Sequence, residues 1–386
     1  MVRPVMRSSV AVVGGLLALT LAACGGDKGG SGGGGEGAKS KEPIRVAEIV
    51  DLTGALQSFN EAANPGYDYG FDDINKAGGI NGAPIKVVKY DTGTVTPQAP
   101  QLLRKAAQDG AVAVVGPFSS NMAVAAAPVA AQQKVPMMLP TSIATWPTDF
   151  NDFTFRITPP LTVVIPKYIP QVLGDIGAKK VGIVYDKANE ASVTFFNEVQ
   201  KAVPAAGATI TGVEAFKTGD VDFTAQVSKL LAGKPDAIVV GAISTEAALV
   251  MRQLRQRGFE GRFVSEATLN NPDLLKQSGG AAKGLLTYQV WNPEGSDPET
   301  TSIRERYGKN VPGTIGQTYA ATQVLAAALK RAKDPHDPES VREALSQTDN
   351  VPTVIGPVKW EGKGSNINAS FVVLELGEKG FVPFKP

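Results

Sequence analysis

The sequence predicts an α/β protein made of two doubly wound parallel-sheet lobes with a ligand cleft between them. Short apolar runs, typical of buried strands, alternate with segments whose apolar residues recur at helical spacing. This alternation begins at residue 44 and begins again after residue 154. Alternating strands and helices are typical of a parallel sheet covered by helices on both faces. The length of 386 residues fits two domains.

The first round of alternation opens with IRVAEIV (44–50), which predicts a buried strand. Residues 64–76 predict a helix because Tyr67, Phe71 and Ile74 recur at i, i+4 and i+7, and Gly78-Gly79 ends it. The remaining elements of this round are expected to be strands at 84–91, 111–115 and 135–140 and helices at 97–108 and 122–133.

The second round follows an extended, proline-rich stretch at 154–160. Asp222 is the expected N-cap of one of its helices. The expected helices of this round are 163–176, 192–205, 222–231, 245–257 and 272–277, and the expected strands are 179–186, 208–216, 236–241, 262–267 and 284–290. The remainder predicts helices at 298–307, 318–331 and 340–345 and strands near 353–360 and 369–376. Open sheets of this kind bind ligands beyond the carboxyl ends of their strands, so a cleft between two lobes is the expected site.

The N-terminus has the layout of a signal peptide. Arg3 and Arg7 precede an apolar run that is too short to span a bilayer comfortably, and small residues then lead to Cys24. The run Leu21-Ala22-Ala23-Cys24 also looks like a bacterial lipobox, in which the cysteine is lipidated and becomes the first residue. The alternative is an ordinary signal peptide, 1–23, followed by an incidental cysteine.

A glycine-rich tether follows Cys24 and extends to Pro43. Nine of the residues from 25 to 43 are glycine, so this segment lacks the apolar surface to fold and is expected to be flexible. A lipid, a tether and a folded body together predict a lipid-anchored protein on the extracytoplasmic face of a bacterial cell membrane.

The composition argues against several classes of function. A formal net charge of +1 gives no support for a nucleic-acid partner. One cysteine and one histidine cannot form a Cys/His zinc site, and a catalytic triad is not expected from His336 in a polar, proline-rich segment. No phosphate-binding loop or dinucleotide fingerprint is present. We therefore expect no metal, no cofactor and no enzyme activity, although a carboxylate pair formed by tertiary contact is open.

Two serines after the predicted strand 111–115 admit two interpretations. Ser119 or Ser120 can cap the helix that follows, since a serine oxygen accepts a backbone N–H there. A helix N-terminus also favours an anion, so the same hydroxyls can hold a ligand carboxylate.

The segment FDDINKAGGINGAPIKVVKYDT (71–92) closely resembles the substrate-binding proteins of branched-chain amino-acid ABC transporters, which have the type I periplasmic binding fold. Further similar segments are VPMMLPTS (135–142), KKVGIVYD (179–186), FKTGDVDFTAQVSKL (216–230), KPDAIVVG (234–241) and IGPVKW (355–360). The resemblance covers about residues 44 to 380. It implies one lobe from 44–160 and 291–365, a second from 161–290 and 366–386, and a three-strand hinge that closes on the ligand.

The resemblance also implies site residues and partners. Ser120, beside Ser119, together with Thr141 and Ser142, would hold the ligand carboxylate. Glu266 would meet the ligand ammonium, with a surface carboxylate as the alternative, and Phe59 would cap the ligand unless it packs locally in its loop. The expected partners are a small carboxylate ligand and the permease and ATPase subunits of an ABC importer, and the protein is expected to be a monomer.

Three positions depart from the family pattern. Ile143 replaces a threonine, Glu190 replaces a tyrosine and Ile243 replaces a tyrosine, so polar contacts are lost and an acid is gained. These changes favour a larger or more apolar carboxylate, an aromatic or amide solute, or a ligand with a basic group near Glu190. A shift of the local alignment by one or two residues is the alternative explanation. A ligand-sensing lipoprotein that signals to a membrane partner without transport is the alternative function.

Overall fold

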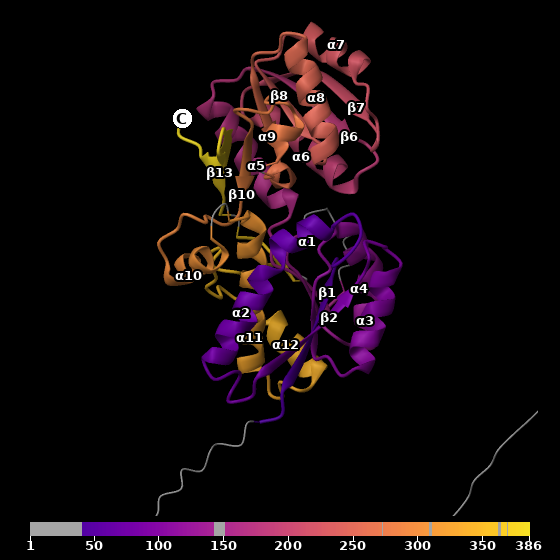
Figure 1. Ribbon diagram of the computed structural model, residues 1–386, viewed down its shortest axis with the longest axis vertical. Coiled ribbons are helices and arrows are strands. Elements are labelled where there is room, and N and C mark those ends of the chain that lie inside the picture. Colours follow the sequence, from indigo (N-terminus) through magenta and orange to yellow (C-terminus); the bar gives the residue numbers. More distant parts are fainter. Residues whose placement is uncertain (1–40, 143–150, 272, 309–310, 362–363, 369) are drawn as a thin grey trace, which may run out of the picture. The chain divides into compact units, whose positions relative to one another are not determined.

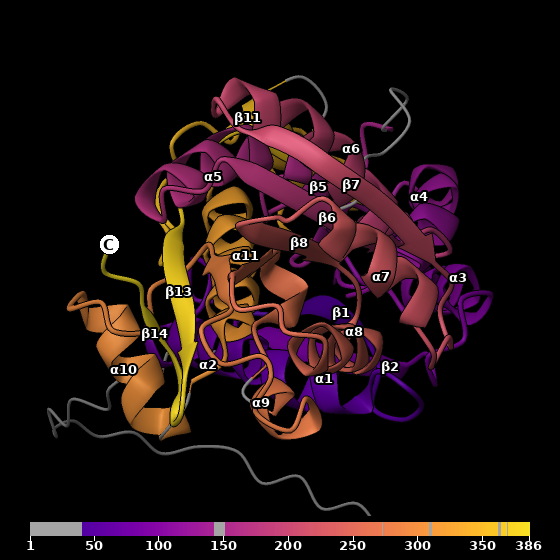
Figure 2. The ribbon, with the colours of Figure 1, turned by 90° about the horizontal axis from the view of Figure 1, so that it is seen from above.

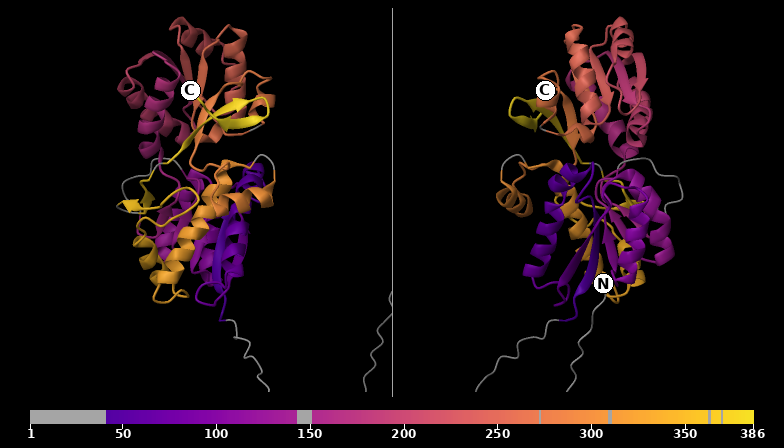
Figure 3. Two further views of the ribbon diagram at one scale, coloured as in Figure 1. Left: turned by 90° about the vertical axis from the view of Figure 1, so that its left-hand side faces the viewer. Right: turned by 45° about the vertical axis from the view of Figure 1, so that its right-hand side comes forward.

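The computed structural model describes residues 41–142, 151–271, 273–308, 311–361, 364–368 and 370–386 (Figure 1). Two seven-stranded sheets form its framework, and helices cover both (Figure 3). The expectations for residues 1–40, which include the signal peptide, Cys24 and most of the tether, lie outside the described residues, as does Ile143.

The first sheet has the strand order β11-β12-β5-β4-β3-β1-β2. Its strands pair in parallel, except that β11 and β12 are antiparallel. Their bounds are β1 (Ile44–Val50), β2 (Ile85–Asp91), β3 (Ala113–Val115), β4 (Met137–Leu139), β5 (Thr154–Arg156), β11 (Trp360–Glu361) and β12 (Ser365–Asn366).

Helices pack on both faces of the first sheet, and the alternation of residues along β1 shows why. Val46 and Val50 point into the core beneath α2 and α11, whereas Ala47 and Ile49 point into the core beneath α3 and α4. A strand that is buried on both faces is mostly apolar, and in β1 the exceptions are the exposed Arg45 near its start and the buried Glu48. The helices in this part are α1 (Gln57–Ala63), α2 (Pro65–Lys76), α3 (Gln98–Gln108), α4 (Ser120–Gln133), α10 (Pro298–Tyr307), α11 (Gly313–Arg331) and α12 (Pro338–Ser346).

The second sheet has the strand order β14-β13-β10-β9-β8-β6-β7. Its strands are parallel from β7 to β10, and β13 and β14 add an antiparallel hairpin at the edge (Figure 2). Their bounds are β6 (Lys180–Asp186), β7 (Thr209–Phe216), β8 (Ala237–Gly241), β9 (Arg262–Ser265), β10 (Leu286–Gln289), β13 (Val372–Gly377) and β14 (Gly380–Pro383). The helices are α5 (Leu161–Asp175), α6 (Glu190–Ala205), α7 (Thr224–Ala232), α8 (Ser244–Gln256), α9 (Leu274–Gln277) and the 3₁₀ turn η1 (Ala267–Leu269).

The chain passes between the two sheets three times. The three connections lie between β5 and α5, between β10 and α10, and between β12 and β13. Asn366 joins the first and third connections, because its amide donates to the Ile157 carbonyl at 2.9 Å. The Gln317 amide donates to the Thr158 hydroxyl at 2.9 Å, so α11 also holds the first connection.

The predicted fold class is confirmed, but several predicted elements are wrong in detail. Residues 353–360 were expected to form a strand, yet the described structure is a turn closed by the bridge between Val351 and Val358, and β11 begins only at Trp360. Gly356 has φ +94°, which suits a turn and not a strand. The helix expected at 222–231 begins at Thr224, with Phe223 and not Asp222 at the N-cap position, although the Asp222 carboxylate still accepts from the Thr224 N–H.

Other boundaries differ by a few residues. The helix expected at 318–331 begins five residues earlier, at Gly313, and the helix expected at 272–277 is the short α9. The sequence interpretation missed α1, η1, β12 and β14. All four are short, and α1 lies in a segment whose apolar residues are too few to give a helical pattern.

Candidate ligand-binding site

The turn after β3 places the first group of site residues. Gly116 has φ +89°, and a Cβ there would lie 2.2 Å from the Ile49 carbonyl oxygen, so only glycine fits this close approach to β1. The turn brings Phe118, Ser119 and Ser120 to the carboxyl edge of the first sheet, where α4 begins. This edge is where parallel sheets bind their ligands.

Ser119 and Ser120 have different roles at the start of α4. Ser119 is the N-cap, and its hydroxyl oxygen accepts from the Met122 N–H at 3.2 Å. Ser120 is the first helical residue, and its oxygen accepts from the Ser142 hydroxyl at 3.2 Å. A serine hydroxyl can donate one hydrogen bond and accept others, so Ser120 is chemically able to contact an anion. The helix N-terminus adds partial positive charge at this point.

The residues after β4 meet the same turn. The Thr141 hydroxyl donates to the Phe118 carbonyl at 2.9 Å, and Ser142 is fully buried. The structure therefore brings together four of the predicted residues: Ser119, Ser120, Thr141 and Ser142.

Phe59 joins this group through an aromatic contact. It lies in α1, is half-buried, and packs edge-on against Phe118 with ring centroids 5.7 Å apart. Phe59 therefore lies in a helix and packs against a turn far away in the sequence, not within its own loop, and a ligand contact for Phe59 stays a prediction.

Three further predicted residues lie at the carboxyl ends of strands in the second sheet. Glu190 is the first residue of α6, just after β6, and is exposed. Ile243 precedes α8, just after β8, and is 40% exposed. Glu266 follows β9 and is buried. The parallel order of β6, β8 and β9 places all three residues at one edge of this sheet.

Glu266 is the most unusual of these groups. Its two carboxylate oxygens accept from the N–H and the hydroxyl of Thr268, the N–H bond being 2.8 Å long. Burial raises the pKa of Glu266 to about 7, although the bonds from Thr268 act in the opposite direction. The expectation of a surface carboxylate is wrong, since Glu266 is 2% exposed. A buried carboxylate whose pKa lies near 7 is suited to bind a cationic group, because the cation compensates for the burial of its negative charge.

The backbone carbonyl of Glu266 accepts two hydrogen bonds, as its side chain does. The hydroxyls of Ser265 and Thr287 both donate to the Glu266 carbonyl, at 3.2 and 2.8 Å. Glu266 also caps η1 by accepting from Thr268. The carboxylate is therefore fixed at the carboxyl end of β9 before any ligand arrives.

The sequence interpretation missed two groups near the site. One group is the pair Tyr168 and Tyr288, whose ring centroids lie 4.8 Å apart. The negative charge of Glu266 helps to raise the pKa of both tyrosines. Asp51 follows β1, is fully buried and accepts from the Thr92 hydroxyl, and burial raises its pKa. A polar residue directly after the first strand was a usable signal for Asp51, whereas no local pattern links residues 168 and 288.

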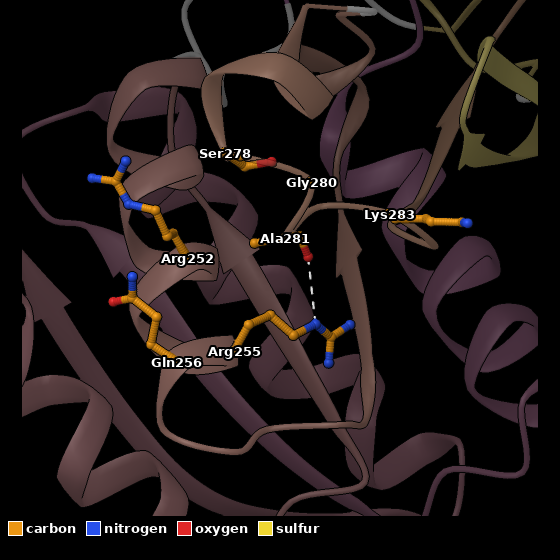
Figure 4. A pocket seen from close by; sticks show the side chains of 8 residues that line it. Arg252, Arg255, Gln256, Ser278, Gly280, Ala281 and Lys283 are labelled. Atoms are coloured by element: carbon orange, nitrogen blue, oxygen red, sulfur yellow. Dashed lines mark hydrogen bonds between the residues drawn. The ribbon is translucent and has the colours of Figure 1, made fainter.

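A cavity of the second sheet lies away from these residues. It has a volume of about 490 Å³ and is lined by Arg252, Arg255, Gln256, Ser278, Gly279, Gly280, Ala281 and Lys283 (Figure 4). Arg255 donates to the carbonyls of Phe259, Gly261 and Ala281, so its guanidinium holds loops together. Lys283 pairs with Glu378 at 2.7 Å and points away from the arginines. None of the predicted site residues lines this cavity.

The described residues contain no group of three or more His, Cys, Asp and Glu side chains able to hold a metal ion. In the same residues, no helix has the length and apolar character needed to cross a membrane.

Comparison with known proteins agrees with this architecture. The family model for periplasmic binding proteins matches residues 43–380. An amino acid binding protein of Pseudomonas aeruginosa is 31% identical over 338 residues, which cover 85% of this chain and 88% of that protein. The Leu/Ile/Val-binding protein of Escherichia coli is 25% identical over 343 residues, covering 88% and 92% of the two chains.

Solved structures show the same fold. The leucine binding protein LivK of Thermotoga maritima superposes with a TM-score of 0.80 and 26% identity, covering 89% of this chain and 98% of that one. LivJ of Streptococcus pneumoniae, solved in complex with isoleucine, gives a TM-score of 0.78 at 23% identity, over 89% of this chain and all of that one. The predicted resemblance is confirmed: the chain belongs to the periplasmic binding protein family and is an extracytoplasmic solute-binding protein, not an enzyme.

Proposed function

We propose that the protein captures an amino acid or a related small carboxylate and delivers it to the permease of an ABC importer. The main support is the cluster of Ser119, Ser120, Thr141 and Ser142 at the N-terminus of α4, where hydroxyls and helix N–H groups suit an anion. Relatives of this chain are named as amino acid binding and Leu/Ile/Val-binding proteins.

Capture requires two lobes that close. One lobe comprises residues 44–160 and 291–366, and the other comprises 161–290 and 367–386, because β12 of the first sheet ends at Asn366, one residue later than the sequence resemblance implies. The carboxylate anchors belong to the first, and Glu266 belongs to the second. A ligand that bridges both anchors favours the closed state, and a transporter can recognise that state.

The ligand is distinguished by groups that line the cleft of the second lobe. Glu190 is exposed at the start of α6, and Ile243 is 40% exposed before α8. An apolar and an acidic contact together favour a ligand with a bulky apolar side chain or with a second basic group. Ile143 completes the set of departures from the family pattern.

A ligand screen tests this function. Thermal denaturation is followed with L-leucine, L-isoleucine, L-valine, L-arginine, L-phenylalanine, aromatic acids and amides, and each compound that raises the melting temperature is titrated by calorimetry. A ligand at one hundred times its Kd adds about 2.7 kcal/mol of stability. The absence of any response across these classes contradicts the proposal.

Variants then locate the anchors. Ser120→Ala and Glu266→Ala are expected to weaken binding by about tenfold or more, because hydrogen bonds to charged groups contribute about 1.5–3 kcal/mol. Ser119→Ala is the matched control: it removes the N-cap and lowers stability by about 1 kcal/mol, with a smaller effect on affinity. Equal losses of affinity for Ser119→Ala and Ser120→Ala contradict the assignment of Ser120.

The attachment to the membrane is a separate proposal. Cys24 carries the lipid after removal of residues 1–23, and residues 25–43 form the tether. Cys24→Ser is expected to move the protein from the membrane fraction to the soluble fraction of cells. The protein is expected to elute as a monomer in size-exclusion chromatography with light scattering.

Sensing without transport is the second candidate, because lobe closure serves either purpose. Uptake of radiolabelled ligand by vesicles that contain the neighbouring permease and ATPase distinguishes the two functions. Uptake that depends on the binding protein supports transport, and a signalling response without uptake supports sensing.

A further inference from the structure

Three aromatic residues from distant parts of the chain meet in the second sheet. Tyr168 and Tyr288 lie 4.8 Å apart between ring centroids, and Phe371 lies 5.9 Å from Tyr168 and 6.0 Å from Tyr288. We name Tyr168, Tyr288 and Phe371 the aromatic triad. Offset and edge-on contacts of this kind are favourable beyond the area they bury.

Each member of the triad lies in or beside a different connection between the sheets. Tyr168 lies in α5, which follows the first connection, and Tyr288 lies in β10, which leads into the second. Phe371 directly precedes β13, at the end of the third. The aromatic triad therefore packs together the two elements that adjoin the first and second connections and the end of the third.

Hydrogen bonds also link the elements of the triad to the turn that carries Glu266. The hydroxyl of Thr287, the neighbour of Tyr288 in β10, donates to the Glu266 carbonyl at 2.8 Å. The Tyr168 hydroxyl donates to the Leu286 carbonyl of β10 at 3.1 Å. Both tyrosine rings are buried, so these bonds form a continuous path from Glu266 to α5 and β10.

The negative charge of Glu266 affects the pKa of both tyrosines of the triad. Burial, and after it the charge of Glu266, raise the pKa of Tyr168 and of Tyr288 well above their usual range. Around Glu266, η1 contributes Thr268, α5 contributes Tyr168 and β10 contributes Tyr288. Helix α8 also packs on η1, and the carboxylate of its Glu246 accepts from the Gly219 N–H. Among the described residues, no charged side chain contributes to the pKa of Glu266.

We propose that the aromatic triad couples the occupation of Glu266 to the angle between the two lobes. This coupling rests on the proposed function, which makes Glu266 the receiver of a cationic ligand group. An ionised carboxylate without a cation resists the loss of water that closure brings, and a bound ammonium removes this resistance. Adjustment of the Glu266 turn then moves β10 and Tyr288 through the Thr287 hydrogen bond, and the packed rings pass the movement to α5 and to the end of the third connection.

Spin-label distance measurements on the full chain test the coupling. Labels are placed at Arg104→Cys in α3 and Ala225→Cys in α7, which are both exposed, in a Cys24→Ser background. Glu266→Gln mimics a neutralised carboxylate without any ligand and is expected to shift the distance distribution toward that of the closed state. Adding Phe371→Leu is expected to abolish this shift.

Phe196→Leu is the matched control. Phe196 is also half-buried and stacks on a tyrosine of the second sheet, Tyr185, at 4.0 Å, but it lies on none of the three connections. This variant is expected to retain the full response to Glu266→Gln. Tyr168→Phe keeps the ring, removes only the hydroxyl that bonds Leu286, and replaces Phe371→Leu if thermal denaturation shows that the latter does not fold.

The outcomes separate the coupling from the proposed function. An unchanged distance distribution in Glu266→Gln, or equal effects of Phe371→Leu and Phe196→Leu, overturns the coupling. If L-leucine closes the protein and Phe371→Leu closes equally well, the coupling alone fails. If no amino acid binds but Glu266→Gln still shifts the distribution in a manner that depends on Phe371, the coupling stands and the proposed ligand class fails.

Discussion

At the scale of single residues, two buried glutamates dominate the electrostatics. Glu48 in β1 and Glu266 after β9 are both nearly inaccessible to water, and burial raises the pKa of each to about 7. Glu48 has Lys89 as an ionic neighbour at 3.4 Å, which is too long for a good hydrogen bond, whereas Glu266 has only the two bonds from Thr268. The two carboxylates therefore predict different pH effects.

Glu266 predicts a pH-dependent affinity. Since its pKa lies near 7, the ionised form that attracts an ammonium is a minority at pH 6 and a majority at pH 8. Affinity for an amino acid is expected to rise about tenfold between these pH values. Calorimetric titration of the wild type and of Glu266→Gln measures this dependence. A wild-type affinity that is the same at both pH values contradicts the role of Glu266.

Glu48 predicts a pH-dependent stability. Its pKa is higher in the folded protein than its ordinary value of 4.5, so the folded state binds the proton more tightly. Its contribution is therefore fully present below about pH 4.5 and is lost as the pH rises through about 7. Glu48→Gln is expected to raise the free energy of unfolding at pH 8 by about 1–3 kcal/mol and to have little effect at pH 5.

Urea denaturation at both pH values measures the effect of Glu48→Gln. Glu61→Gln, at an exposed position in α1, is the control and is expected to change stability little at either pH. Lys89 keeps its 2.7 Å contact with Asp68 in the variant. A loss of stability at pH 8 would show that the Lys89 attraction outweighs the burial of Glu48.

At the scale of helices and strands, close packing of α2 on α11 forms part of the first core. Gly70 lies against Thr322 of α11, and a Cβ at Gly70 would lie 1.9 Å from the Thr322 hydroxyl oxygen. Gly70→Ala is expected to separate the helices and to cost about 1–3 kcal/mol. Gly174→Ala in α5 is the matched control, because nothing lies within 4 Å of its Cβ, and it is expected to stabilise the protein by up to about 1 kcal/mol. Chemical denaturation measures both, and a neutral Gly70→Ala would contradict this packing.

The elements also show what the sequence can predict. Strands buried on both faces, such as β1 and β8, appear as continuous apolar runs, so their positions were predicted closely. The turn at 353–360 contains the same apolar residue types, and only Gly356 and Pro357 distinguish it from a strand. The local sequence pattern does not distinguish a strand from a turn here. The outcome depends on whether a strand far away in the sequence is available for pairing.

The site shows the same limit. The hydroxyl cluster was predictable because Ser119, Ser120, Thr141 and Ser142 directly follow two strands whose carboxyl ends adjoin. The burial of Glu266 was not, since it depends on Thr268 and on tyrosines contributed by α5 and β10. An interaction such as that of Tyr168 with Glu266, between residues far apart in the sequence, leaves no local signal.

At the scale of the whole molecule, the side chain of Asn366 links two of the connections between the sheets by hydrogen bonds. It is 1% exposed, its amide donates to the Ile157 carbonyl of the first connection, and its oxygen accepts from the N–H groups of Lys359 and Asn368. Removing it leaves buried backbone groups without partners. Asn366→Ala is therefore expected to cost about 1–3 kcal/mol.

Asn366→Ala is also expected to broaden the distribution of distances between labels at positions 104 and 225, because the first and third connections then move independently. Asn368→Ala is the control: the side chain of this neighbouring asparagine donates to the Pro357 carbonyl, within the segment that leads into β11 and β12. It is expected to leave the distribution as narrow as in the wild type. If both variants broaden the distribution equally, the restraint lies in the segment after β12 as a whole. If neither does, the packed side chains around the connections hold the two sheets without help from the Asn366 hydrogen bonds, and the loss from Asn366→Ala will appear only in the free energy of unfolding.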